Sequence, residues 1–176
     1  PEKPAKSQNL LLNGSFDQGE LAPDHWEKIS IRNAGRPENL WKPEPGRGYV
    51  AGEELAESGA GGWKQAVTLE PDGHYRMEAD IRTENMAGRG IGASILFPRF
   101  RWMRPVTARN DAGWNHVESD VINSGFTELE LYCIYGAYGL NTGYGWFDNI
   151  ELYELPIPAM DETVTRAVQI GDFSLR

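Results

Sequence analysis

The stretch His74-Tyr-Arg-Met-Glu-Ala-Asp-Ile-Arg-Thr83 alternates apolar and charged side chains along most of its length. Apolar residues occupy every second position: Tyr75, Met77, Ala79 and Ile81. Charged residues fill the positions between them: Arg76, Glu78, Asp80 and Arg82. Successive side chains of a strand point to opposite faces of its sheet. The stretch therefore predicts a strand with one face in a core and the other in water.

Similar segments surround this stretch, and turn sequences such as Pro45-Gly46 and Glu70-Pro-Asp-Gly73 separate them. We expect further strands at 26–32, 47–54, 62–69, 90–103, 114–121, 128–135 and 144–155. No segment before residue 158 has a convincing helical period. Many short strands between turn signals are typical of a sandwich or barrel. The sequence thus predicts an all-β fold, an antiparallel β-sandwich jelly roll.

One folded unit accounts for most of the 176 residues. Residues 1–8 resemble a solvated linker, 9–155 form the predicted sandwich, and 156–176 are expected to be an extension or a linker toward a further domain. The sequence begins at Pro1 rather than Met, so any export signal would already be gone. We expect a secreted, cell-surface or periplasmic protein.

The charge balance limits the partners that this chain can bind. Asp and Glu number 26 against 17 Lys and Arg, a net charge of −9. Nucleic acid and anionic lipid are therefore disfavoured, because their phosphates require a basic surface. No apolar run is long enough to span a membrane. Six Trp and seven Tyr are a generous supply; some will be core, and aromatic rings outside the core are well suited to binding surfaces.

The strand predicted at 128–135 contains the only cysteine, Cys133. A single cysteine excludes an intramolecular disulfide and a cysteine-based zinc site. Because Cys133 alternates with Leu129 and Leu131, we expect a buried thiol rather than a nucleophile. Glu130, Tyr132 and Ile134 then face away from the core.

Two motifs frame the predicted sandwich. The first reads Asn9-Leu-Leu-Leu-Asn-Gly-Ser-Phe-Asp17 and is followed by Trp26, and the second reads Gly145-Trp-Phe-Asp-Asn-Ile150. In this order and spacing they resemble the first and last strands of jelly-roll carbohydrate-binding modules of families 4, 9, 16 and 22. The resemblance covers about 9–154 and implies a non-catalytic domain that binds polysaccharide on a concave sheet.

The resemblance also implies a structural calcium ion between the first and last strands. Asp17 and Asp148 match the acidic positions that ligate this ion in the families, although Glu is commoner there at the position of Asp17. Calcium takes six to eight oxygen ligands, and backbone carbonyls would complete the set. The alternative is that both are ordinary turn and cap residues.

Three groups of residues are candidates for the sugar site. Glu130 and Tyr132 lie on the outward face of the strand at 128–135, where the alternative is an ordinary solvated face. Arg99, Arg101 and Trp102 combine stacking faces with guanidinium forks that bind hydroxyls or carboxylates, which suggests a polysaccharide that is acidic. The alternative there is core aromatics and surface ion pairs. Trp41 and Tyr138 are expected to be loop aromatics, whereas Trp63, Trp114 and Trp146 are expected to pack.

No pattern in the sequence indicates an enzyme. His25, His74 and His116 lack metal-ligand spacing, and there is neither a Gly-x-Ser-x-Gly elbow nor a phosphate loop. We expect a non-catalytic module that is covalently linked to a glycoside hydrolase or polysaccharide lyase. The alternatives are a structural spacer or docking domain and a small jelly-roll polysaccharide lyase.

Overall fold

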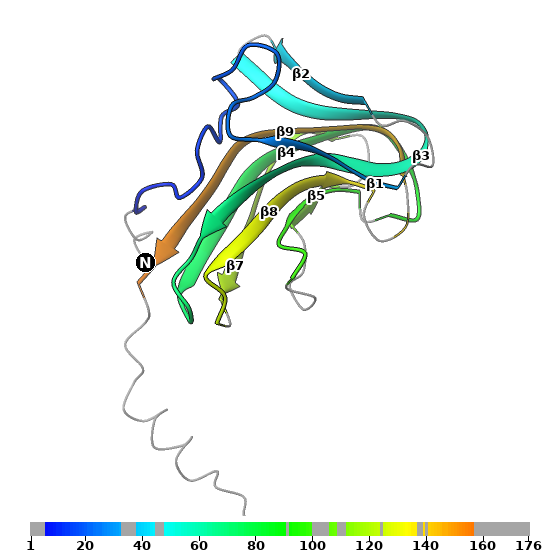
Figure 1. The fold of residues 1–176 in the computed structure, drawn as a ribbon. Coiled ribbons are helices and arrows are strands. Elements are labelled where there is room, and N and C mark those ends of the chain that lie inside the picture. The colour runs from blue at the N-terminus through cyan, green and yellow to red at the C-terminus, as the bar shows by residue number, and fades with distance from the viewer. Residues whose placement is uncertain are drawn as a thin grey trace, which may run out of the picture.

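The computed structural model describes residues 6–32, 38–44, 48–90, 92–99, 106–108, 112–123, 125–136, 139 and 141–156. None of these residues lies in a helix, so the part of the chain described contains no helix that could cross a membrane. The strands are β1 Glu27–Arg32, β2 Glu38–Glu44, β3 Gly48–Thr68, β4 His74–Gly88, β5 Ala93–Leu96, β6 Val106–Ala108, β7 Ala112–Ile122, β8 Glu128–Tyr135 and β9 Asn141–Leu155 (Figure 1).

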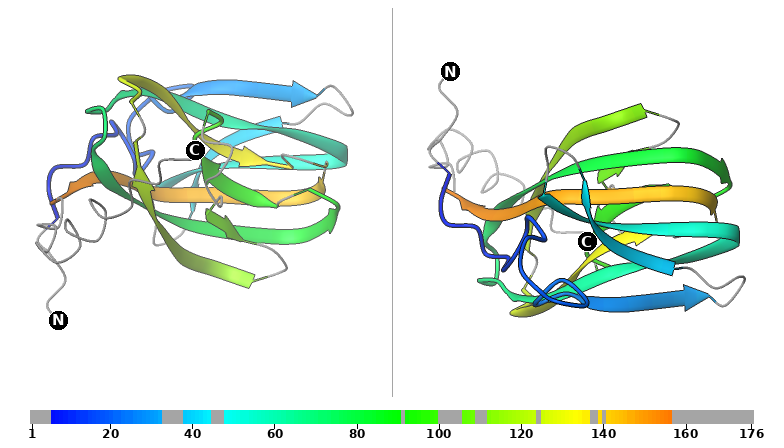
Figure 2. Two further views of the ribbon diagram at one scale, coloured as in Figure 1. Left: turned by 90° about the horizontal axis from the view of Figure 1, so that it is seen from below. Right: turned by 90° about the horizontal axis from the view of Figure 1, so that it is seen from above.

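The strands form two antiparallel sheets. The β8 sheet has the order β6-β5-β8-β3-β1, and the β4 sheet has the order β2-β3-β9-β4-β7. Figure 2 shows β9 between β3 and β4. This arrangement confirms the predicted all-β, antiparallel β-sandwich.

β3 belongs to both sheets. Its residues 51–59 pair with β9, and its residues 61–68 pair with β8. The sequence predicts two strands here, at 47–54 and 62–69, and the tract Ser58-Gly-Ala-Gly-Gly62 leads into the second. In the structure these small residues instead let one continuous strand pass from sheet to sheet.

The core lies between the inner faces of the two sheets. On β4 the predicted apolar face is buried, with Tyr75, Met77, Ala79 and Ile81 at most 2% exposed. On β8, Leu129, Leu131 and Cys133 are at most 3% exposed. Full burial of such a large apolar side chain stabilises the fold by about 1.5–3 kcal/mol. The two-residue alternation therefore predicts the inner face of both strands correctly.

The opening motif lies along the last strand (Figure 1). The Leu10 amide donates to the Leu152 carbonyl over 2.7 Å, and the Ile150 amide donates to the Gly14 carbonyl over 2.8 Å. Phe16 is fully buried, and its ring centroid lies 4.8 Å from that of Trp26. Within the stretch expected to be a linker, Lys6 contacts Glu78 and Glu151. The opening motif therefore lies beside the closing motif, which is part of β9.

Trp41 and Trp114 differ from their predicted environments. Trp41 lies in β2 rather than in a loop; it is half-buried, packs against the core, and donates its indole N–H to the Phe16 carbonyl over 2.8 Å. Trp63 and Trp146 are buried, but Trp114 is only partly so. The Pro-rich surroundings of Trp41 concealed an edge strand, in which proline is tolerated.

Candidate functional site

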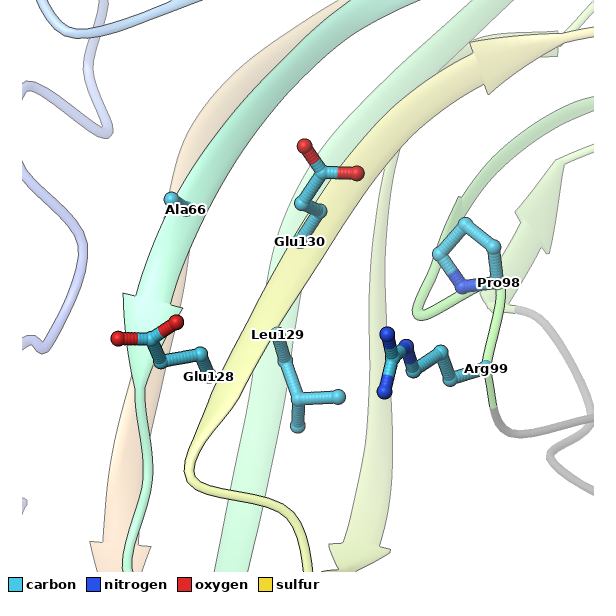
Figure 3. A pocket seen from close by; sticks show the side chains of 6 residues that line it. All are labelled: Ala66, Pro98, Arg99, Glu128, Leu129 and Glu130. Atoms are coloured by element: carbon cyan, nitrogen blue, oxygen red, sulfur yellow. The ribbon is translucent and has the colours of Figure 1, made fainter.

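A pocket of about 310 Å³ opens on the outer face of the β8 sheet (Figure 3). It is lined by Ala66, Pro98, Arg99, Glu128, Leu129 and Glu130. These residues come from β3, from β8 and from the segment that follows β5. The pocket therefore brings together Arg99 and Glu130, two residues that the sequence pointed to separately.

Glu130 is the acceptor at the centre of this face. Lys64 Nζ donates to its Oε1 over 2.8 Å, and the Tyr132 hydroxyl donates to its Oε2 over 3.0 Å. Lys64 lies directly opposite Tyr132 in the register of β3 and β8. The bond from Lys64, followed by that from Tyr132, lowers the pKa of Glu130. Glu130 is therefore an ionised carboxylate, whose remaining lone pairs can accept bonds from a ligand.

Arg99 lies across the pocket from Glu130. Its side chain is exposed, and its guanidinium carbon is 5.6 Å from the ring centroid of Phe126. Figure 3 shows the guanidinium pointing toward β8. A planar fork held over an aromatic ring keeps its donors directed and partly ordered.

Tyr132 presents an amphipathic side chain beside the pocket. Its ring packs against Leu96 and Ile134, which are buried on the outer face of the β8 sheet. Desolvation, and then the bond to Glu130, raise the pKa of its hydroxyl. The prediction that Glu130 and Tyr132 face away from the core is therefore confirmed. Ile134 faces the same way, but it is buried.

Several predicted site residues are not part of this pocket. Arg101, Trp102 and Tyr138 lie outside the described residues. Trp41 faces the core from β2, in the other sheet. Lys64 and Glu128 were not predicted from the sequence. The outward position of Lys64 could have been predicted from strand alternation, because its neighbours Trp63 and Gln65 are both buried.

Asp17 and Asp148 occupy the two motifs that the structure places side by side. Asp148 is 1% exposed, its Oδ1 accepts the Asn149 amide over 2.8 Å, and it lies directly opposite Asp80 of β4. Asp17 is exposed and follows the buried Phe16. Neighbouring like charges are destabilising in a sheet. Calcium ligation by Asp17 and Asp148 stays a prediction; carboxylate and carbonyl oxygens are the donors that calcium prefers.

Comparisons with known proteins bear on the fold. No protein-family model matches the sequence, and no curated protein matches it. Among solved structures, TmCBM61 in complex with β-1,4-galactotriose is similar with a TM-score of 0.58 and 19% identity, over 85% of this chain and 100% of that one. A family 4 carbohydrate-binding module is similar with a TM-score of 0.55 and 16% identity, over 82% of this chain and 99% of that one.

A third similar structure is the CBM22-1 xylan-binding domain from Paenibacillus barcinonensis Xyn10C, with a TM-score of 0.53 and 14% identity. The similarity covers 87% of this chain and 99% of that domain. At such low identities a structural likeness establishes the fold alone. This chain has the β-sandwich fold of carbohydrate-binding modules, in agreement with the resemblance of its two framing motifs.

Proposed function

We propose that this protein is a non-catalytic carbohydrate-binding module that binds a polysaccharide at the pocket on the β8 sheet. The observation that carries the proposal is the convergence of Arg99, Glu130 and Tyr132 on one open face of the fold. Arg99 donates to ring hydroxyls through its fork, and Glu130 accepts from them. Tyr132 adds an apolar ring edge beside these polar groups.

The charges of the pocket favour a neutral glycan. Among the residues that the structure describes, two carboxylates, of Glu128 and Glu130, and one guanidinium, of Arg99, line it. The ammonium of Lys64 is already shared between Glu130 and Glu27. A uronate chain would bring further negative charge against this balance. β-1,4-Galactotriose and xylan, which appear with the similar modules, are both neutral ligands of the favoured kind.

The module is proposed to serve a larger secreted enzyme. An arabinofuranosidase structure, MgGH51, is similar to 85% of this chain over 27% of its own length, with a TM-score of 0.58 and 14% identity. A sandwich of this fold therefore occurs as a minor part of an arabinofuranosidase chain. We extend the proposal to a calcium ion held by Asp17 and Asp148, which would stabilise the junction of the first and last segments without contributing to sugar binding.

Affinity electrophoresis against galactan, xylan, β-glucan and polygalacturonate tests the function. We expect retardation by at least one neutral polymer, and calorimetry should show Arg99→Ala and Glu130→Gln weakening that binding about tenfold or more. Asp120→Asn removes a charge from the other sheet and should leave the affinity unchanged. Retardation by polygalacturonate alone would show that the ligand is acidic and not neutral.

Two other outcomes would assign the protein to different classes. Binding to none of the polymers would favour a structural spacer or docking domain. Release of an unsaturated uronate, detected by its ultraviolet absorbance, would identify a polysaccharide lyase.

A further inference from the structure

The outer face of the β4 sheet carries a row of three glutamates. Glu78 of β4 lies directly opposite Glu118 of β7 on one side and Glu151 of β9 on the other. In the next row, Asp80 lies directly opposite His116 and Asp148. Like charges that face one another across strands destabilise a sheet, so this arrangement requires positive charge at its centre.

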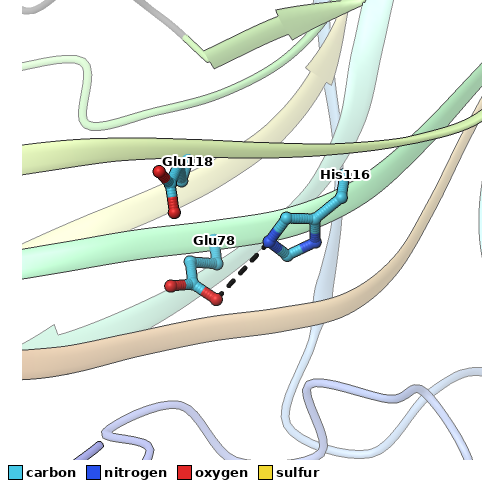
Figure 4. Close-up of side chains that lie close together, drawn as sticks. All are labelled: Glu78, His116 and Glu118. Carbon is cyan, nitrogen blue, oxygen red and sulfur yellow. Dashed lines mark ion pairs between the residues drawn. The ribbon is translucent and has the colours of Figure 1, made fainter. Parts of the chain in front are cut away.

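Glu78, His116 and Glu118 lie close enough together to hold one metal ion (Figure 4). One ligand atom from each lies within 4.8 Å of the others. His116 Nε2 is 3.5 Å from Glu78 Oε2, which is long for a hydrogen bond. That separation is close to the edge of about 3.3 Å between two ligand atoms of a tetrahedral zinc ion with bonds of about 2.0 Å.

The imidazole of His116 is oriented by groups behind it. Its Nδ1 lies 3.0 Å from Asp80 Oδ1, and Asp80 Oδ2 accepts from Asn149 Nδ2 over 2.9 Å. With its proton on Nδ1, toward Asp80, the imidazole would direct the lone pair of Nε2 toward Glu78. Metal-binding histidines in proteins are generally held through the other ring nitrogen, by a carboxylate, a backbone carbonyl or water.

Glu78 supplies the buried anchor of the cluster. It is 1% exposed, and the Tyr153 hydroxyl donates to its Oε1, which leaves Oε2 as the oxygen on the side of His116. Glu118 and His116 are about half exposed, so both can adjust toward an ion. Arg76 Nη1 lies 4.0 Å from Glu118 Oε2, but its Nε is bound to Asp120 at 2.7 Å.

We propose that Glu78, His116 and Glu118 bind a zinc ion, with solvent as the fourth ligand. An imidazole with two carboxylates suits a first-row divalent metal better than calcium, which takes oxygen ligands. The site is on the opposite sheet from the sugar pocket, and it shares no ligand with the calcium position proposed for Asp17 and Asp148.

Lys6 is the native competitor for this site. Its Nζ lies 2.7 Å from Glu78 Oε2 and also contacts Glu151. The Lys6 side chain is 42% exposed, so its ammonium can move into water when an ion arrives. Zinc and Lys6 therefore exclude one another at the same carboxylate oxygen, and zinc binding would release Lys6 from β4.

Calorimetric titration of the whole chain with Zn²⁺, in excess Ca²⁺, tests the proposal. We expect one zinc site per chain. Its affinity for zinc should fall about tenfold or more in His116→Ala and in Glu118→Gln. His74→Ala removes another histidine, on β4, and should leave the affinity unchanged. Lys6→Met should tighten zinc binding, because it removes the competing ammonium. Co²⁺ in place of Zn²⁺ should give a visible absorption spectrum that His116→Ala abolishes.

The proposal is overturned if folded wild-type protein gives no zinc-dependent heat in excess calcium. It is also overturned if His116→Ala binds zinc as tightly as wild type, or if His74→Ala loses as much affinity as His116→Ala. Weaker binding in Lys6→Met would contradict the competition. Polysaccharide binding is tested separately, with Arg99→Ala at the pocket on the β8 sheet. Either proposal can therefore fail without the other.

Discussion

Tyr153, on the outer face of the β4 sheet, has a pKa that depends on its neighbours. It is 3% exposed, and its hydroxyl donates to Glu78. Desolvation, followed by this hydrogen bond, raises the pKa of Tyr153 to about 12. The fold thus favours the protonated phenol more strongly than the unfolded chain does.

This shift predicts a loss of stability in alkali. The contribution of Tyr153 is fully present below the phenol's ordinary pKa of about 10 and is lost as pH rises toward 12. Urea unfolding between these pH values should show a falling free energy of unfolding. Tyr153→Phe has no phenolic proton and should show a smaller slope. Equal slopes in the two proteins would mean that other groups cause the loss.

At the scale of single residues, alternation predicts which face a side chain occupies but not what covers that face. The inward positions of Leu129, Leu131 and Cys133 were predicted correctly, and burial raises the pKa of the Cys133 thiol well above its ordinary value. Ile134 was expected to face outward, yet it is buried beside Leu96. Leu96 lies on β5, and sequence spacing does not indicate which strand pairs with β8.

At the scale of elements, β3 separates what the sequence predicts from what only the structure shows. β8 was predicted with its observed bounds, because Glu128–Tyr135 alternates cleanly and has turn residues before it. β3 was predicted as two strands, 47–54 and 62–69, and a glycine-rich tract leads into the second; glycine weakens a strand interior and often marks a bend. Whether such glycines end a strand or bend it depends on partners far away in the chain, here β8 and β9.

The bend predicts that Gly62 is indispensable. Its φ is +145°, and a Cβ there would clash with the Cys133 carbonyl oxygen of β8. Gly62→Ala should lower the free energy of unfolding by about 3 kcal/mol or more. Gly113 of β7 has open space where a Cβ would lie, so Gly113→Ala is the control and should change stability by no more than about 0.5 kcal/mol. Similar losses in both variants, measured by urea unfolding, would refute the steric argument.

At the scale of the whole molecule, the first and last segments close the sandwich, and the framing motifs indicated this meeting from sequence. The pocket was only partly predictable, since Arg99 and Glu130 are 31 positions apart (130 − 99) and meet through the pairing of β5 with β8. The opposite cluster of Glu78, His116 and Glu118 was missed: His116 and Glu118 are two residues apart on one face of β7, but only strand register brings them to Glu78.

The calcium proposal is tested at this scale. A chelator selective for calcium should lower the melting temperature of the wild-type protein, because the ion would bind only the folded junction. Asp148→Ala should melt at a lower temperature and lose its sensitivity to the chelator. A melting temperature that the chelator leaves unchanged, with no calcium in elemental analysis of the protein, would contradict the proposal.

The passage of β3 through both sheets has a consequence for how this chain can be rearranged. Neither sheet corresponds to a continuous piece of sequence, since each takes part of β3 and the other strands of the two sheets alternate along the chain. One cut in the chain therefore cannot produce a fragment that contains one complete sheet. Recombination at a single point between two related genes likewise cannot exchange one sheet and keep the other. New sequence can be accepted only between strands, so variants of this molecule are expected to differ in their loops while the two layers are inherited together.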